Sequence, residues 1–424
     1  MPKSFLSSVI CPLSSVICYL SSVVCYLSSD PDLCYLKRGG NEVSHILILG
    51  GDGYLGWPTA MAFSQEGHEV WVVDNYLRRS LCRDLDVEPL FSTPNLLERV
   101  CVWKGVSGKD IHIRIGDCCD YGFLSQVFRE CRPEAVIHYA EQPSAPYSML
   151  NQKAANLTLT NNLQSTLNII WAVHEHAPEC HIIKLGTMGE YGTPDIDVEE
   201  GWIEIEHKGR RDRFLFPRQA SSLYHTTKVQ DTDLLWFYVR TWGLRVTDLM
   251  QGPVYGLSTE ETDLDERLGT FFNYDEIFGT VVNRFVIQAV AGYPLTVYGK
   301  GGQTRGYINI KDVLACVELA LMSPADAGEL RVLNQITETF TVNELAEKVA
   351  RVGKELGHTV EIKSIENPRK ELEEHYYNPT YTGLIELGLK PHYLTDEVVA
   401  DMFETGIKYK KNIQTERIFR GVKW

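Results

Sequence analysis

A short apolar run followed by a cluster of glycines constrains the fold of this chain more than any other feature. Residues 45–51 read HILILGG, and the loop continues to Gly56 with the spacing GxxGxxG from Gly50. An apolar run of this length suits a strand that is buried on both faces of a parallel sheet. A glycine-rich turn directly after such a strand predicts a helix, here over residues 54–66.

Further apolar runs follow, separated by stretches long enough for helices. They cover residues 69–75, 111–117, 135–140, 181–187 and 244–250. Alternating strands and helices predict an α/β fold with a Rossmann-type doubly wound parallel sheet.

The composition becomes acidic and irregular after Gly256. This stretch cannot build a large sheet of its own, and it predicts a smaller α/β domain that closes over the carboxyl ends of the strands, where open sheets bind ligands. We therefore expect a dinucleotide-binding domain over 45–256 and a substrate domain over 257–424, with some exchange of chain between the two.

A repeated tract precedes the first strand. Residues 5–25 read FLSSVIC, PLSSVIC and YLSSVVC, with Lys3 as a weak basic start and Pro12 inside the tract. These features argue against a signal peptide and against a membrane helix. We expect residues 1–44 to be a leader outside the fold, disordered or spurious, with a targeting segment as the alternative and no stable membrane insertion.

The charge and the cysteines exclude other classes of protein. The net charge of -15 argues against a nucleic-acid-binding protein, because such a protein needs a basic face. The cysteines after the leader are scattered and form no paired CxxC pattern, so we expect no metal site and reduced thiols, most of them in the core. The expected compartment is the cytoplasm, or the plastid stroma if the leader is a targeting segment.

The glycine loop and Asp74 predict the cofactor. The glycines let backbone approach a pyrophosphate at a helix N-terminus. Asp74 ends the next strand, where a carboxylate accepts hydrogen bonds from ribose hydroxyls and repels the extra phosphate of NADP, so NAD is favoured. Arg78 and Arg79 leave NADP open, although arginines just past a strand are more often solvated. Asp117 ends the third strand and is expected to meet the adenine or, equally, to cap the following helix.

The complete set of predicted cofactor contacts is Gly50, Gly53, Tyr54, Leu55, Gly56, Asp74, Asn75, Tyr76, Leu77, Asp117, Cys118, Tyr224, Lys228, Gln251 and Val254.

Tyr224 and Lys228 form a YxxxK pair after the fifth strand. The four-residue spacing puts both side chains on one helix face. A neighbouring cation lowers the pKa of a phenol, so Tyr224 is a candidate base. The alternative is that Tyr224 and Lys228 are only neighbours on a solvent-exposed helix. The glycine loop earlier in the same predicted sheet favours the catalytic interpretation.

Thr187 and Glu190 complete the predicted catalytic set. Thr187 ends the fifth strand, where a hydroxyl can reach both a sugar and Tyr224. Glu190 lies in a loop with glycines on both sides, so we expect its carboxylate to approach a ligand and transfer a proton, rather than to be solvated.

With these residues in view, the chain resembles the UDP-sulfoquinovose synthases of plants, cyanobacteria and archaea, members of the extended short-chain dehydrogenase/reductase superfamily. The resemblance extends from His45 to the C-terminus. The motifs that carry it include GGDGYLGWPTA, EQPSAPYSM, KLGTMGEYGTP, SSLYHTTK, LTVYGKGGQTRGY and NPRKELEEHYYN.

The resemblance implies that the enzyme uses UDP-glucose and sulfite. Bound NAD oxidises C4, water is eliminated across C5 and C6 with Glu190 as the proton carrier, sulfite adds at C6, and C4 is reduced again. It also implies substrate contacts by Asn161, Thr187 and Gln251 near the sugar and by Arg305 and Arg369 at the diphosphate and uridine end. A homodimer that packs long helices is the default for this type.

One residue departs from the family pattern. Pro143 stands where the motif EQRSAPYS has an arginine, which is implied to contact the substrate. Proline offers no hydrogen-bond donor, so the departure bears on the sulfite step more than on the oxidation. Ser144, Tyr147 and His225 are candidates to compensate.

Two other functions stay open. A nucleotide-sugar 4,6-dehydratase or 4-epimerase has the same fold, but dehydratases of this type usually place an acidic residue directly after the threonine, where this chain has Met188. A non-catalytic NAD-binding protein would not need Tyr224 and Lys228.

Overall fold

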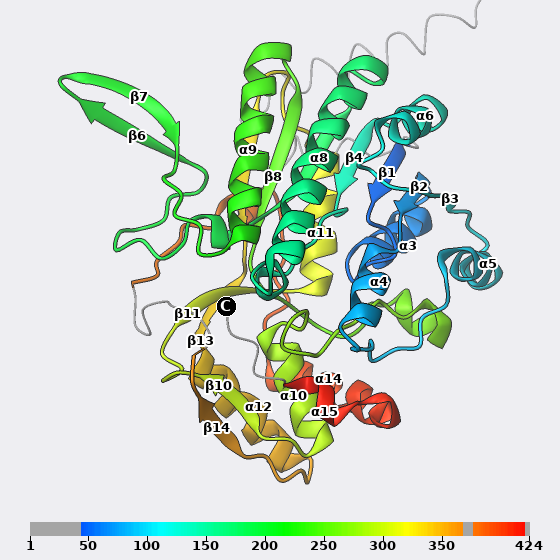
Figure 1. Cartoon of the computed structure of the whole chain (residues 1–424), viewed down its shortest axis with the longest axis vertical. Helices are drawn as coiled ribbons and strands as arrows, with labels where there is room; N and C mark the ends of the chain where they lie inside the picture. The colour runs from blue at the N-terminus through cyan, green and yellow to red at the C-terminus, as the bar shows by residue number, and fades with distance from the viewer. Residues whose placement is uncertain (1–43, 368–375, 420–424) are drawn as a thin grey trace, which may run out of the picture. The chain divides into compact units, whose positions relative to one another are not determined.

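The fold is described by a computed structural model, which covers residues 44–367 and 376–419 (Figure 1). The predicted leader therefore lies outside the described residues except for Ser44, and so does Arg369. The boundary expected near residue 256 stays a prediction.

Seven parallel strands form the main sheet, in the order β12-β8-β5-β4-β1-β2-β3. Their bounds are β1 His45–Leu49, β2 Glu69–Asp74, β3 His112–Ile115, β4 Ala135–His138, β5 His181–Thr187, β8 Arg245–Gln251 and β12 Leu330–Gln335. The predicted doubly wound sheet is confirmed, and each of the six predicted strands is present. The seventh, β12, was not predicted and comes from the part of the chain after residue 257.

Side chains alternate along each strand, so a strand of apolar residues presents an apolar surface on both faces of the sheet. Helices cover both of these faces. Ile46 and Ile48 of β1 face one helical layer, and Leu47 and Leu49 face the other. The first layer contains α3 Gly56–Glu66, α5 Leu96–Ser107 and α11 Ile310–Met322. The second contains α6 Tyr121–Cys131, α8 Gln152–His176 and α9 Leu223–Trp242.

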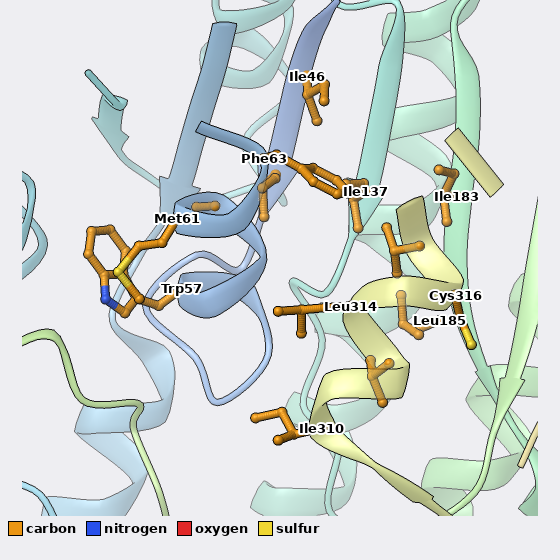
Figure 2. Close-up of a cluster of buried hydrophobic side chains, with 14 of the residues drawn as sticks. Ile46, Trp57, Met61, Phe63, Ile137, Ile183, Leu185, Ile310, Leu314 and Cys316 are labelled. Atoms are coloured by element: carbon orange, nitrogen blue, oxygen red, sulfur yellow. The ribbon is translucent and has the colours of Figure 1, made fainter. Parts of the chain in front are cut away.

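Figure 2 shows how the first layer joins distant parts of the chain. Ile310 and Leu314 of α11 lie in one apolar cluster with Trp57 of α3 and Ile137 of β4. All four side chains are buried. Because α11 packs here and β12 pairs with β8, residues from the C-terminal part of the chain complete the dinucleotide-type sheet.

The rest of the C-terminal part has its own apolar core. It contains two small sheets, one of β9 Val254–Tyr255, β11 Thr304–Asn309 and β13 Glu338–Thr341, the other of β10 Leu295–Tyr298 and β14 Ile362–Ile365. Its helices are α10 Val281–Ala291, α12 Val342–Glu355, α14 Asp396–Lys408 and α15 Thr415–Ile418, whereas Leu384 of α13 Gly383–Glu386 is buried in the apolar cluster of the first layer.

Short elements follow three strands of the main sheet at their carboxyl ends, and a hairpin completes the fold. The short helices α4 Leu77–Asp84 and α7 Ala145–Ser148 follow β2 and β4, and the 3-10 turn η1 Met188–Glu190 follows β5. The antiparallel hairpin of β6 Trp202–His207 and β7 Arg210–Leu215 projects beside α9 (Figure 1).

No helix within residues 44–367 and 376–419 is long and apolar enough to cross a membrane. The seven cysteines in these residues carry free thiols, and Cys82, Cys118, Cys131, Cys180 and Cys316 are buried, which confirms their expected place in the core.

Candidate active site

A cavity of about 510 Å³ lies at the carboxyl ends of the parallel strands. Its lining includes residues at or just after the ends of six of them: Gly50, Asp74, Asp117, Tyr139, Thr187 and Gln251. Residues of the C-terminal part, among them Arg284 and Arg305, line the same cavity. A volume of this size is typical of small-molecule sites, and the edge of the sheet is the one at which α/β folds bind ligands.

The glycine loop between β1 and α3 is built for close backbone approach. Gly50 has φ +89°, and a Cβ at that position would lie 2.7 Å from the carbonyl carbon of Tyr139. A Cβ at Gly56 would lie 2.2 Å from the carbonyl oxygen of Gly50. Since α3 starts at Gly56, its N-terminal amides border the cavity, as a pyrophosphate requires.

Asp74 is held in place by the loop itself. Its carboxylate accepts hydrogen bonds from the backbone amides of Asp52 at 2.9 Å and Tyr76 at 2.6 Å. Burial, and next the charge of Asp52, raise the pKa of Asp74 to about 6. The carboxylate is thus preorganised at the end of β2.

The two arginines after β2 are not solvated. Arg79 donates to both carboxylate oxygens of Asp52, from Nε at 2.6 Å and from Nη2 at 2.8 Å, and Arg99 pairs with the same carboxylate. Arg79 is therefore occupied in fixing the glycine loop. Arg78 lines the cavity, with its guanidinium carbon 4.1 Å from the centre of the Phe278 ring.

Most of the other predicted cofactor residues line the cavity: Gly53, Tyr54, Leu55, Asn75, Leu77, Cys118 and Val254. Tyr76 does not, because its hydroxyl accepts a hydrogen bond from the amide of Leu96 on α5. Asp117 lines the cavity and accepts from the amide of Cys119 at 2.8 Å. The cap of α6 is Asp120, so the helix-cap alternative for Asp117 is wrong.

Thr187, Tyr224 and Lys228 all line the cavity, as predicted from the strand end and the YxxxK spacing. Ser222 caps α9, and the amide of Tyr224 donates to Oγ of Ser148 at 3.1 Å, which fixes the start of this helix. Burial, and next the negative charges of Glu141 and Glu190, raise the pKa of the Tyr224 phenol. The positive charge of Lys184 opposes this rise of the Tyr224 pKa, as expected for a neighbouring cation.

Lys228 is paired with a carboxylate that sequence reasoning did not single out. Its Nζ lies 2.5 Å from Oε1 of Glu141, and both side chains are almost fully buried. Glu141 follows β4 and lines the cavity. The sequence signal that could have identified Glu141 is its position just after a central strand, at the carboxyl end where α/β sheets bind ligands.

Glu190 is not where the sequence suggested. Its side chain has no exposed surface and does not line the cavity. It lies behind Thr187, with Oε1 3.4 Å from Nζ of Lys184 and Oε2 3.6 Å from Nε of Arg218. A carboxylate enclosed by two cations and away from the cavity is suited to hold the loop, so direct proton transfer by Glu190 is disfavoured.

The predicted substrate residues Asn161, Gln251 and Arg305 line the cavity. Nε2 of Gln251 donates to Oε1 of Gln335 at 2.9 Å, which positions its side chain. Arg305 lies on β11, which belongs to the small three-stranded sheet. Arg284 of α10 also lines the cavity, and its guanidinium lies 4.9 Å from the ring centre of Tyr298.

Pro143 lies exposed at the cavity edge in a turn that its neighbours build. The amide of Ser144 donates to Oε1 of Gln142 at 2.6 Å. Oγ of Ser144 donates to the carbonyl of Ile277 at 2.5 Å, so its single proton is already used. Nδ1 of His225 lies 3.0 Å from Oγ of Ser221. Arg78 of α4 lines the same cavity as Pro143, and its guanidinium brings a positive charge there.

The described residues contain no group of three or more His, Cys, Asp or Glu side chains arranged to hold a metal ion.

Comparison with known proteins shows the family of the chain. Residues 46–334 match the model of the NAD dependent epimerase/dehydratase family. The chain is 48% identical over 379 residues to a chloroplastic UDP-sulfoquinovose synthase of Spinacia oleracea, covering 89% of this chain and 79% of that protein. It is 47% identical over 370 residues to a UDP-sulfoquinovose synthase of Sulfolobus acidocaldarius, covering 87% and 94%.

The fold also matches solved structures. A UDP-glucose 4-epimerase of Thermus thermophilus in complex with NAD superposes with a TM-score of 0.60 at 24% identity, covering 85% of this chain and 98% of that one.

Proposed function

Because this chain belongs to the NAD dependent epimerase/dehydratase family and, within it, to the UDP-sulfoquinovose synthases, we propose that it converts UDP-glucose and sulfite to UDP-sulfoquinovose. The observation that carries the proposal is one cavity lined by the glycine loop, Asp74, Thr187, Tyr224 and Lys228.

NAD fits the residues present. The close approach of Gly50 and Gly56 leaves room for a pyrophosphate at the start of α3, and Asp74 is placed for ribose hydroxyls. When bound, NAD would supply a hydride acceptor for C4 of the sugar, and its reduced form would supply the hydride for the final reduction. Arg79 is committed to Asp52, which supports NAD over NADP.

Tyr224 is the proposed acid and base at C4. Its phenolate takes the proton of the 4-hydroxyl as C4 is oxidised and returns it when C4 is reduced. Thr187 is proposed to donate a hydrogen bond to the same oxygen, and Lys228 to hold the phenolate.

Dehydration and sulfite addition occur while C4 is a ketone. The ketone acidifies C5, a base takes the C5 proton, and the C6 hydroxyl leaves as water. The sulfur of sulfite then bonds to C6, C5 regains a proton, and C4 is reduced. Sulfite is an anion, and Arg78 supports its binding in place of the arginine that Pro143 replaces.

Asn161 and Gln251 are proposed to contact the sugar, and Arg305 and Arg369 the diphosphate and uridine. Guanidinium groups suit a diphosphate because they donate paired hydrogen bonds. Arg284 is a further candidate at that end, since its Nε is buried and has no hydrogen-bond partner within the described residues.

A homodimer through α8 and α9 is proposed from their outer face. Trp171 is 39% exposed and Phe237 is 51% exposed, and Tyr238 and Trp242 lie beside them in one aromatic group. Contiguous apolar surface of this kind marks an association site.

The proposed compartment is the cytoplasm, with the plastid stroma as the alternative if residues 1–44 are a targeting segment. The alternative is supported by the Spinacia oleracea relative, which is chloroplastic. Imaging of fluorescent fusions with and without residues 1–44 separates the two.

The test is incubation of the purified protein with NAD, UDP-glucose and sulfite, followed by mass spectrometry. We expect a sulfonated nucleotide sugar, and no turnover from Tyr224→Phe. Formation of UDP-galactose, or of a 4-keto-6-deoxy sugar without sulfite incorporation, would assign the chain to the epimerases or dehydratases instead. Tightly bound NAD without turnover on any nucleotide sugar would indicate a non-catalytic protein.

A further inference from the structure

The pairing of Lys228 with Glu141 is the starting point. Oε1 of Glu141 lies 2.5 Å from Nζ of Lys228 and 3.3 Å from Nε2 of His138. Oε2 of Glu141 is buried and has no hydrogen-bond partner among the described residues. The carboxylate therefore holds the lysine with one oxygen, while its other oxygen is buried without a partner among the described residues, and Glu141 is one of the residues that line the cavity.

The charges around this pair make Glu141 the dominant partner of Lys228. Asp231 is the next carboxylate, with Oδ2 4.0 Å from Nζ. Burial alone lowers the pKa of Lys228, but Glu141 and Asp231 outweigh it and raise that pKa. Burial and the two cations Lys228 and Lys184 lower the pKa of His138 far below its ordinary value, so His138 stays neutral and does not compete.

We propose that Glu141 is a positioning residue of the catalytic site, which holds the ammonium of Lys228 and thereby sets the protonation state of the Tyr224 phenol during C4 oxidation. The inference rests on the proposed function, because it assigns a role within that reaction. The predicted catalytic set of Thr187, Tyr224 and Lys228 does not include Glu141. The inference adds Glu141 as the side chain that controls when the Tyr224 phenol loses its proton.

Two consequences follow from the geometry. While Glu141 neutralises Lys228, the charge available to stabilise a Tyr224 phenolate is small, and the phenol keeps its proton. Removing the Glu141 carboxylate leaves more of the positive charge of Lys228 to stabilise the Tyr224 phenolate. The pKa of the phenol is therefore lower, and the phenolate forms at lower pH. Titratable and charged groups face this site from every neighbouring element: Arg78 on α4, His138 at the end of β4, Glu141 after β4, Lys184 on β5, Glu190 on η1, His225 and Asp231 on α9, and Asp248 on β8.

The experiment measures C4 oxidation alone. Enzyme with bound NAD is mixed with UDP-glucose without sulfite, and the rate of NADH absorbance is recorded against pH for the wild type, Glu141→Gln and Glu141→Asp. We expect the acidic limb of the profile to move to lower pH by about one unit in Glu141→Gln, as for a unit charge removed several ångströms away. Glu141→Asp keeps the charge and is expected to move the limb less.

The outcomes are distinguishable. An unchanged limb in Glu141→Gln overturns the inference, even if the rate falls, because a merely structural role changes the rate or the fold and not the position of the limb. If Glu141→Gln does not fold, Glu141→Ala is measured in the same way with the same expectation. Absence of any UDP-glucose-dependent NADH signal in the wild type overturns the proposed function instead.

Discussion

Nζ of Lys184 lies 3.4 Å from Oε1 of Glu190, and neither side chain has any exposed surface. Lys184 also lies 3.2 Å from Oδ2 of Asp248 and donates to Oγ1 of Thr232 at 2.7 Å. The turn η1, which directly follows Thr187 at the end of β5, is therefore tied through Lys184 to Asp248 on β8 and Thr232 on α9 by buried polar contacts.

From this relationship we predict that Glu190→Gln acts through stability. Loss of one member of a buried ion pair leaves an uncompensated charge and costs about 3 kcal/mol of unfolding free energy. Urea unfolding measures the change, with Glu204→Gln on the exposed hairpin as a control expected to stay within about 0.5 kcal/mol of the wild type. A Glu190→Gln protein with wild-type stability but no dehydration step would restore Glu190 as the proton carrier.

Gly56→Ala is predicted to impair NAD binding. The added Cβ would lie 2.2 Å from the carbonyl oxygen of Gly50 and 2.9 Å from Cα of Gly51. Both are backbone atoms, which cannot rotate out of the way as the end of a flexible side chain can. Overpacking of this kind costs about 1–3 kcal/mol, so we expect the Kd for NAD to rise about tenfold or more. Isothermal titration calorimetry provides the Kd.

The matched control for this substitution is Gly105→Ala. Gly105 lies exposed in α5, with no atom within 4 Å of the added Cβ. Alanine is favoured over glycine in a helix by about 1 kcal/mol, so this variant is expected to bind NAD normally and to unfold at slightly higher urea. Equal NAD affinity in both variants would contradict the role given to the Gly56 contact.

Local sequence signals were sufficient for six of the seven strands of the main sheet and for the glycine loop. Each of the six predicted strands is an apolar run, and Gly50, Asp74 and Thr187 follow from their positions at strand ends. The seventh strand, β12, was missed because it carries Arg331, Asn334 and Gln335 and follows β8 only after a long excursion into the C-terminal part.

The buried position of Glu190 differs from the predicted approach to a ligand, and this difference has an identifiable cause. The flanking glycines suggest a close approach to a ligand, and Gly189 and Gly192 do line the cavity, but both also pack closely and the side chain of Glu190 between them is buried. A Cβ at Gly189 would lie 2.4 Å from Nε2 of His225, and one at Gly192 would lie 2.0 Å from the carbonyl oxygen of Gln219. A usable signal was Lys184. A lysine inside a strand buried on both faces needs a carboxylate, and Glu190 is six residues away.

The Glu141 and Lys228 pair could not be predicted in the same way. The two residues are 87 positions apart, and their contact depends on how β4 and α9 pack within the fold. Sequence spacing places Lys228 beside Tyr224 on one helix face, but it does not reveal which charge neutralises the lysine.

The pH dependence of NAD binding is predicted from Asp74. Its pKa is raised to about 6, mainly by burial, so the carboxyl becomes protonated as the pH falls through about 6 and loses its capacity to accept from both ribose hydroxyls. We expect the Kd for NAD to be about tenfold weaker one pH unit below that value than on the alkaline plateau. Asp74→Asn should bind NAD more weakly with little pH dependence in this range, as measured by calorimetry across the pH series.

The same shift has a stability consequence of defined sign. The folded chain binds the Asp74 proton more tightly than the unfolded chain, so its contribution to the free energy of unfolding is fully present below pH 3.8 and is lost as the pH rises through about 6. In Asp74→Asn this contribution should vanish from urea unfolding profiles. A profile equal to that of the wild type would show that Asp74 does not titrate in this window.

The last prediction concerns association through α8 and α9. Phe237→Asp places a charge in the exposed aromatic group beside Tyr238, where burial against a second copy would desolvate it, so we expect the proposed dimer to dissociate in sedimentation velocity. Phe214→Asp is the matched control, because Phe214 is 48% exposed on the projecting hairpin and lies outside this group. Its sedimentation should equal that of the wild type. Loss of the dimer in Phe214→Asp but not in Phe237→Asp would move the interface from the two long helices to the hairpin.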